Sequence, residues 1–251
     1  TLVSRILMAL AMGLLIYHSP TFRAYRLGFQ LRNFSNKILK RLLHVGIPAG
    51  FQFMAEVSAF GYAAIMVGWL GAEPLAAHQI AINLASISYM MATGIAAAAT
   101  IRVGNQLGRQ DIQALREAGF VSFVMSALFM GVAAIVFIAG QTFFPTLYVA
   151  DPEVIRIAAA LIIVAAFFQI SDGVQVVGMG ALRGLTDVKM PTLIAILAYW
   201  MIGLPLGYWL GVKLGYGAVG IWYGLLAGLT VAAVLLLLRF HRLSLSLFGK
   251  Q

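Results

Sequence analysis

The feature that most constrains this sequence is a series of long runs that carry either no charged residue or a single acidic one. Each of six runs is at least 23 residues long, and about 20 apolar residues in a helix cross the hydrocarbon core of a bilayer. Apolar and polar residues do not alternate along them, as they would in the strands of a membrane barrel. The sequence therefore predicts an all-α polytopic membrane protein. The six runs are 42–72, 74–101, 118–150, 157–182, 190–212 and 214–238, and a shorter run, 6–22, precedes them.

The composition excludes a water-soluble domain and several kinds of chemistry. Charged residues make up 10% of the chain and hydrophobic residues 62%, whereas soluble domains carry about 25% charged residues. There is no Cys, which excludes disulfides, thiol chemistry and Cys-ligated metals. The sequence also lacks a nucleophile–base arrangement, a His pair at helical spacing and a complete phosphate-binding loop. We therefore expect no enzyme and no cofactor.

The basic residues predict how the helices are oriented. Fourteen of the 17 Lys and Arg residues lie in alternate connections or after the last run, and only Arg5, Arg156 and Lys213 lie on the opposite side. By the positive-inside rule the basic side is cytoplasmic, which puts the C-terminus in the cytoplasm. This placement accounts for the net charge of +9 through topology and contact with membrane lipids. We therefore expect no nucleic-acid partner.

Two acidic residues, Glu56 and Asp172, lie deep inside otherwise apolar runs. A charge at mid-bilayer costs about 2.5–3.5 kcal/mol on insertion scales, and such residues usually face the interior of the helix bundle. Glu56 is 15 residues after Arg41, and Asp172 is 11 residues before Arg183, so both lie about 15–25 Å from the cytoplasmic charges. The runs contain no Lys or Arg to neutralise them. This leaves a proton, a metal ion or a cationic substrate as partner, or else two separately protonated core carboxyls.

Uncharged oxygen donors in the same runs could complete a site for a hard cation. Any one of them could instead form a hydrogen bond between helices, and for Gln79 and Tyr89 the residues alone leave both roles open. The donors are Gln52, Ser58, Gln79, Asn83, Ser86, Tyr89, Gln169, Ser171 and Gln175.

Two further patterns concern helix packing and the membrane surface. Glycine recurs at spacing four in two stripes, which favours close packing of the last two spans. His78 lies near the end of a run, so we expect it at the membrane interface. The stripes are Gly203, Gly207 and Gly211, and Gly220, Gly224 and Gly228.

Several motifs, in order along nearly the whole chain, resemble those of the MATE multidrug and toxic-compound exporters, in particular the NorM-type bacterial members. They correspond to the seventh, eighth, tenth and eleventh helices of that family. The motifs are Gly46-Ile47-Pro48 with Glu56-Val57-Ser58, Ala77-His78-Gln79 with Ile101-Arg102-Val103-Gly104, Gln169-Ile170-Ser171-Asp172-Gly173, and Tyr199-Trp200 with Gly203-Leu204-Pro205.

The resemblance implies one lobe of a two-lobe transporter with twelve helices. Residues 1–18 would be the end of helix six of an N-terminal lobe that is largely missing from the chain. Residues 19–44 would be the cytoplasmic interlobe linker, and residues 45–251 the C-terminal six-helix lobe. The implied spans are about 45–71, 75–101, 118–140, 154–182, 190–212 and 215–238.

The resemblance also implies a function and a site. Members of the family export small cationic drugs or dyes in exchange for Na+ or H+, and the NorM-type members lie in the bacterial cytoplasmic (inner) membrane and are linked to antibiotic resistance. The family often has a Tyr where this chain has Phe168, so one hydroxyl ligand is missing and H+ stays open beside Na+. No metal other than Na+ is implied. The implied ion-coupling residues are Glu56, Asp172, Gln79 and Tyr89, with Asn83, Gln175 and Phe168 around them.

Three alternatives stay open at this point. One is a lipid-linked oligosaccharide flippase of the same superfamily, which would tend to line its cavity with basic residues. Another is a truncated half that folds but transports nothing. The third is an intramembrane enzyme, which no motif supports.

Overall fold

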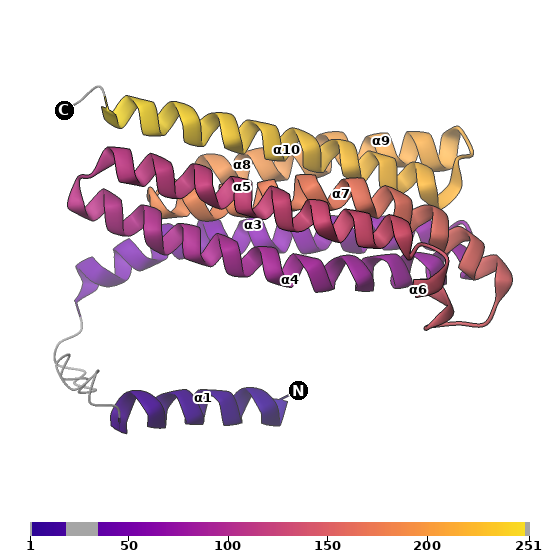
Figure 1. The fold of residues 1–251 in the computed structure, drawn as a ribbon, viewed down its shortest axis with the longest axis horizontal. Helices are drawn as coiled ribbons and strands as arrows, with labels where there is room; N and C mark the ends of the chain where they lie inside the picture. Colours follow the sequence, from indigo (N-terminus) through magenta and orange to yellow (C-terminus); the bar gives the residue numbers. More distant parts are fainter. Residues whose placement is uncertain (1, 19–34, 249–251) are drawn as a thin grey trace. The chain divides into compact units, whose positions relative to one another are not determined.

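The computed structural model describes residues 2–18 and 35–248. The chain divides into two units, residues 1–43 and 44–251. In the first unit, α1 (Leu2–His18) is an apolar helix with no buried residue, drawn in indigo in Figure 1. At 17 residues it is shorter than the roughly 20 residues that are typical of a membrane span. Most of the predicted linker, residues 19–34, lies outside the described residues.

Six helical segments of the described residues are long and apolar enough to cross a membrane, as the six long runs of the sequence predicted. The first, α3, begins at Asn36, so the last residues of the predicted linker are already helical. A four-residue helix, α6 (Phe143–Thr146), follows the third segment. The six segments are α3 (Asn36–Gly68), α4 (Ala72–Arg109), α5 (Ile112–Ala139), α7 (Pro152–Gly184), Lys189–Lys213 and α10 (Gly217–Phe248).

Local sequence signals set where these helices begin. Asp151 caps α7 by accepting a hydrogen bond of 2.9 Å from the backbone N–H of Glu153, and Pro152 occupies the first turn, where its missing N–H is tolerated. Asp111 caps α5 through the N–H of Ala114 in the same way. Between α3 and α4, Gly71 has a φ of 128°, a backbone conformation that favours glycine.

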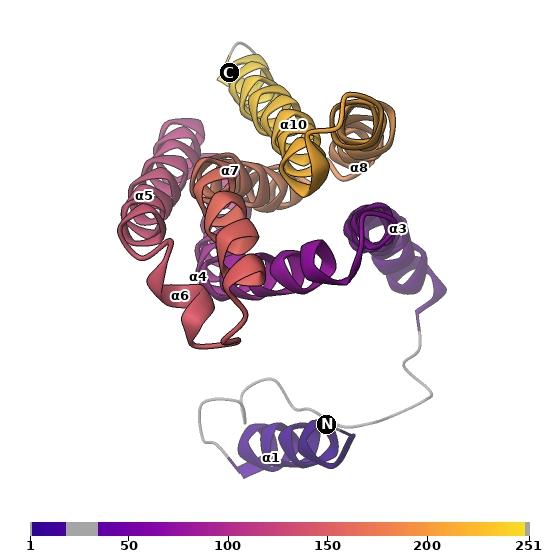
Figure 2. The same cartoon turned by 90° about the vertical axis from the view of Figure 1, so that its right-hand side faces the viewer.

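Helix α7 is the central element of the second unit and packs against α4, α5 and α10 (Figure 2). Small residues allow the contact with α4. A Cβ on Gly180 would lie 2.4 Å from the carbonyl oxygen of Ala96, and Thr100 donates a hydrogen bond of 2.8 Å to the Gly180 carbonyl. The two backbones therefore touch directly, as helices in membranes do at small residues.

The predicted glycine stripes form a second backbone contact, here called the glycine seam, between Gly203–Gly211 and Gly220–Gly228. A Cβ on Gly224 would lie 2.2 Å from the backbone nitrogen of Gly207, and one on Gly228 would lie 2.6 Å from the Ala198 carbonyl oxygen. No side chain fits between these helices, so the seam confirms the close packing that the spacing predicted.

The fifth segment is not a uniform α-helix. It consists of α8 (Lys189–Ile196), the π-helix η2 (Leu197–Gly203), α9 (Leu204–Tyr208) and the π-helix η3 (Trp209–Lys213). π-helical turns inside α-helices are frequent at functional sites. Here η2 places two neighbouring aromatic side chains, Tyr199 and Trp200, against α3.

Large apolar side chains cover much of the outside of the second unit. Leu128 and Ile135 on α5 and Met90 on α4 are each about two-thirds exposed. Soluble proteins rarely expose contiguous apolar patches of this kind. The exposed surface is therefore suited to a hydrocarbon environment.

His78 is turned into the interior of the helix bundle. It is buried, and its Nδ1 accepts a hydrogen bond of 3.0 Å from Nε1 of the buried Trp222 on α10. The residue lies only seven positions into α4, yet it joins two helices in the interior. Its closeness to the end of a run gave no information on which side of the helix it lies.

Candidate functional site

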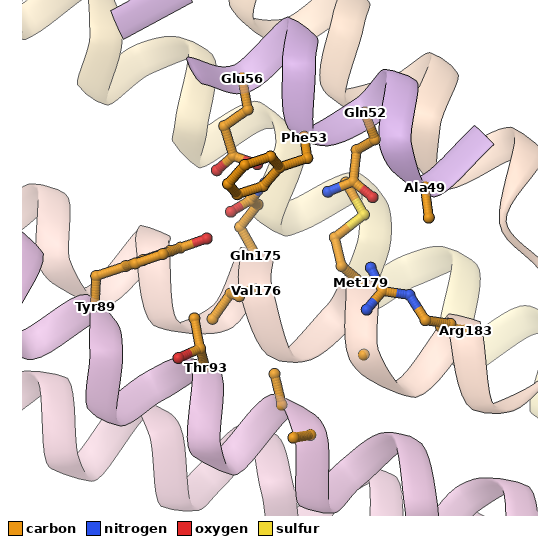
Figure 3. A pocket seen from close by; sticks show the side chains of 13 residues that line it. Ala49, Gln52, Phe53, Glu56, Tyr89, Thr93, Gln175, Val176, Met179 and Arg183 are labelled. Carbon is orange, nitrogen blue, oxygen red and sulfur yellow. The ribbon is translucent and has the colours of Figure 1, made fainter. Parts of the chain in front are cut away.

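Glu56 lies near the middle of α3 with its side chain turned to the interior. The residue is 7% exposed. The Tyr199 hydroxyl donates to Oε1 of Glu56 over 3.4 Å, and the side chains of Gln52 and Gln175 lie beside the carboxyl group (Figure 3). Three helical segments, α3, α7 and η2, therefore supply the surroundings of this one carboxyl group.

Asp172 lies on α7 and is 5% exposed. It lines a cavity of about 260 Å³ together with Glu56, here called the acid cavity. Tyr89, Phe60 and Phe168 are among the other residues that line it. The two acidic residues that stand out in the sequence thus share one largely apolar space.

A second cavity, of about 230 Å³, lies on the other side of Glu56 and is more polar. Figure 3 shows Gln52 and Gln175 directed into it, with Tyr89 reaching towards it from α4. Glu56 and Tyr89 line both cavities. A cation at Glu56 would therefore be reachable from either space.

Gln175 has the most unusual environment of these side chains. It is 1% exposed, and neither polar atom of its amide has a hydrogen-bond partner among the described residues. A buried amide without partners costs about 1–3 kcal/mol. The amide lies beside Glu56 and is directed into the second cavity, where it could turn towards a bound cation.

The structure brings some predicted site residues together and leaves others apart. Tyr89, Gln175 and Phe168 join the two acids at the cavities. Gln79 is exposed and lines neither cavity. Asn83 is also exposed, and its Oδ1 accepts a hydrogen bond of 2.9 Å from the Tyr148 hydroxyl.

Two residues near the acids were not singled out as site residues from the sequence. Tyr199 lies ten residues after Lys189, which is about 15 Å of helix, so its depth matches that of Glu56 and could have indicated it. Arg183 was counted with the cytoplasmic charges, yet it lines the second cavity together with Glu56. The spans themselves contain no Lys or Arg, but the long Arg183 side chain reaches back along α7 to the wall of this cavity.

A buried polar cluster lies between α4 and α7. Ser88 on α4 donates a hydrogen bond of 2.5 Å to Oε1 of Gln169, and both residues are buried. The Gln169 amide nitrogen and the Ser126 hydroxyl have no partner in the part of the chain that the structure describes. The Ser88–Gln169 hydrogen bond joins α4 to α7 about one turn of helix before Asp172.

The oxygen atoms at the site suit a hard cation or a proton. Two carboxyl groups, the Tyr199 hydroxyl and the free Gln175 amide oxygen are donors of the type that alkali and alkaline-earth ions prefer. In residues 2–18 and 35–248, no group of three or more His, Cys, Asp or Glu residues could hold a metal ion.

A bundle of apolar helices around two buried acids defines the chain as a polytopic membrane protein with acidic side chains in its interior. Residues 48–209 match the family model MatE, and the chain belongs to the MatE family. Its curated relatives place it among the NorM-type bacterial members.

The curated relatives match this chain over most of its length. It is 43% identical to the "Multidrug resistance protein NorM" of Burkholderia vietnamiensis over 217 residues, 84% of this chain and 47% of the relative. It is 40% identical to the "Probable multidrug resistance protein NorM" of Rhodopseudomonas palustris over 241 residues, 94% of this chain and 51% of the relative. The chain thus spans about half the length of the curated relatives it matches.

A solved structure supports the fold. The eukaryotic MATE transporter AtDTX14 matches with a TM-score of 0.87 at 20% identity, over 99% of this chain and 56% of the other. At this identity the likeness shows the fold alone. The predicted all-α fold is confirmed by this match and by the six spans.

Proposed function

We propose that the chain is the ion-coupling lobe of a multidrug exporter, which exchanges Na+ or H+ for small cationic amphipathic compounds across the bacterial cytoplasmic membrane. The observation that carries the proposal is that Glu56 and Asp172, both buried side chains, line the same cavity. Neither acid takes part in the ion pairs of the described residues, Arg156–Glu153 and Arg239–Asp187. The names of the relatives support efflux as the activity.

The proposed mechanism follows from the cost of keeping charge in an apolar interior. Two ionised carboxyl groups in the acid cavity repel each other and are poorly solvated. A bound Na+ or proton removes that penalty and favours a dry, closed arrangement, whereas loss of the cation favours a hydrated one. The ion and the exported cation would then alternate through two arrangements of the protein, with reciprocal effects on each other's affinity.

The residues that would hold Na+ are Glu56, Asp172, the Tyr199 hydroxyl and the Gln175 amide oxygen. Phe168 brings a phenyl ring and no oxygen to the acid cavity. A proton needs only the carboxyl groups themselves. The choice between the two ions therefore depends on whether Gln175 and Tyr199 supply enough oxygen ligands.

The remaining parts of the proposal concern surroundings and partners. We propose that the C-terminus is cytoplasmic, since the basic residues are concentrated on that side. We also propose that a second six-helix lobe completes the substrate path, because the chain spans about half of its relatives. Membrane lipids would cover the apolar outer surface, and the transported compounds would be cationic drugs or dyes.

The flippase alternative has less support from the cavity lining. Of the thirteen residues that line the second cavity, Arg183 is the one basic residue, and the acid cavity is lined by two acids and no base. An anionic lipid-linked sugar would meet repulsion there. The acidic lining favours a cationic substrate.

Efflux by substituted proteins tests the proposal. The chain would be joined to the N-terminal half of a curated relative and expressed in bacteria that lack their own exporters. Glu56→Gln and Asp172→Asn should each abolish ion-driven ethidium efflux, while Glu73→Gln, an exposed acid in the first turn of α4, should leave it unchanged. Normal efflux by both of the first two variants would refute the assignment.

A further inference from the structure

An aromatic pocket lies on the side of α3 that faces the fifth helical segment. It has a volume of about 380 Å³, which is in the range of small-molecule sites. It shares no lining residue with either cavity at Glu56. Its lining residues are Tyr62, Met66, Trp200, Leu204, Pro205 and Tyr208.

Three aromatic rings give the pocket its chemistry. The Tyr62 and Trp200 rings are 6.3 Å apart and inclined by 36°, and Tyr208 lies two turns beyond Trp200. Each of the three side chains is about 40% exposed, so ring surface is accessible. No acidic or basic residue lines the pocket. Any attraction for charge therefore comes from the faces of the rings, which attract cations.

A cationic side chain, Lys213, already lies near one of these rings. Its Nζ lies 6.0 Å from the centre of the Tyr208 ring, within the range of a cation–π contact. The ammonium group is at the end of a flexible side chain and is not part of the pocket lining. A soluble cation could replace it over the ring.

Trp200 connects the pocket to the acid site. Its Nε1 donates a hydrogen bond of 3.1 Å to the backbone carbonyl of Ala55, the residue before Glu56. The neighbouring residue Tyr199 donates to the Glu56 carboxyl group itself. Because both aromatic residues lie in η2, a shift of the Trp200 ring would be passed to the backbone and the side chain of the coupling residue.

We propose that the aromatic pocket binds lipophilic aromatic cations, and that Trp200 links its occupancy to cation binding at Glu56. The inference rests on the proposed efflux function and deepens it, because it assigns a second contact point for the exported compound. Recognition comes from stacking and cation–π attraction at Tyr62, Trp200 and Tyr208. The linkage runs through the Trp200–Ala55 hydrogen bond.

Binding of tetraphenylphosphonium to the purified full chain in detergent tests the first part. Tyr62→Leu and Tyr208→Leu should each weaken binding by about 2- to 30-fold, the range of a cation–π contact. Lys213→Met should tighten it, because a competing cation is removed from the Tyr208 ring. Tyr216→Leu, an exposed tyrosine outside the pocket, is the matched control, and neutral triphenylphosphine oxide should show no gain with Lys213→Met.

One specific result would contradict the proposal that the aromatic pocket binds the cation. If Glu56→Gln abolishes tetraphenylphosphonium binding while the Tyr62, Tyr208 and Lys213 variants bind as the wild type does, the probe occupies the acid cavity. The proposed function would survive that outcome and the aromatic pocket would not. Since the three substituted side chains are partly exposed or flexible, gel filtration of each variant is a sufficient check that it is folded.

The linkage has its own measurement. In the wild type, saturating tetraphenylphosphonium should change the affinity for Na+, or the number of protons released, by a measurable factor. Trp200→Phe keeps a ring in the pocket but removes the donor to Ala55, so it should still bind the probe and lose the effect on the ion. An unchanged effect in Trp200→Phe overturns the linkage. Failure of the wild type to bind Na+ or release protons at all would contradict the proposed function itself.

Discussion

Tyr199 and Glu56 meet across two helices that are far apart in the sequence, with the hydroxyl of one donating to the carboxyl group of the other over 3.4 Å. This is long for an O–H···O hydrogen bond, which is usually 2.5–3.0 Å. The tyrosine therefore orients the carboxyl group without binding it strongly. A carboxyl group held in this way is free to turn towards an arriving cation.

Removing this hydroxyl should weaken ion binding more than it weakens the fold. Tyr199→Phe keeps the ring that packs on Phe60 at 5.8 Å, while Na+ affinity should fall by about 2- to 10-fold, the value of one modest hydrogen bond. Equilibrium dialysis with radioactive Na+ measures the change. Tyr216→Phe serves as the control, and equal affinities in the two variants would argue against a role for Tyr199.

Gln175 should show a conflict between stability and function. Gln175→Leu removes a buried amide whose polar atoms have no hydrogen-bond partner among the described residues, so the free energy of unfolding should rise by about 1–3 kcal/mol. The same change removes an oxygen donor and should lower cation affinity. Denaturation in detergent and ion binding measure the two effects.

The exposed Gln79 offers the comparison for that experiment. Gln79→Leu should change neither quantity by much, because its side chain lines neither cavity. A loss of stability in Gln175→Leu would mean that the amide is bonded in solution and is not available to an ion.

Phe168 should control the preference between Na+ and H+. Phe168→Tyr adds a hydroxyl group at the wall of the acid cavity, near Asp172, so Na+ affinity should rise by about 2- to 10-fold. Phe137→Tyr, at a buried position that lines neither cavity, is the control. Na+ dependence of efflux that stays the same in Phe168→Tyr would show that this ring does not face the ion.

The contact between α4 and α7 should tolerate no added side chain. In Gly180→Ala the new Cβ would lie 2.4 Å from a backbone oxygen that cannot rotate away, which should cost about 1–3 kcal/mol or more. Gly131→Ala on α5 meets nothing within 4 Å and should be neutral or stabilising by up to about 1 kcal/mol. Thermal unfolding in the same detergent compares the two, and equal stabilities would contradict the direct backbone contact.

Much of this architecture was predictable because a bilayer permits few alternatives. Runs without charge predicted the six spans, the cost of intramembrane acids singled out Glu56 and Asp172, and glycine spacing predicted the seam. The first two of these inferences depend on position along the membrane normal, and the third depends on residues at spacing four sharing one face of a helix. Sequence provides that coordinate well, since a helix rises by about 1.5 Å per residue.

What sequence could not provide is the direction in which a side chain points around its helix. Gln79 and Tyr89 looked equally suited to a site, but they lie ten residues apart on α4 and point in different directions. Gln79 is exposed, whereas Tyr89 lines the cavity together with the two acids. His78, expected at the membrane interface from its place along the run, has its side chain turned into the helix bundle. The direction of the Tyr199 side chain depends on a π-helical turn, which no residue pattern predicted. The contact of Arg183 with the second cavity depends on a flexible side chain.

The glycine seam has a consequence for how the lobe changes shape. Since the backbones of α9 and α10 touch with no side chain between them, neither helix can slide or roll without its neighbour. The two helices must move together as one rigid unit. Any movement within this lobe that accompanies transport would therefore occur at other helix contacts, where side chains rather than backbones touch.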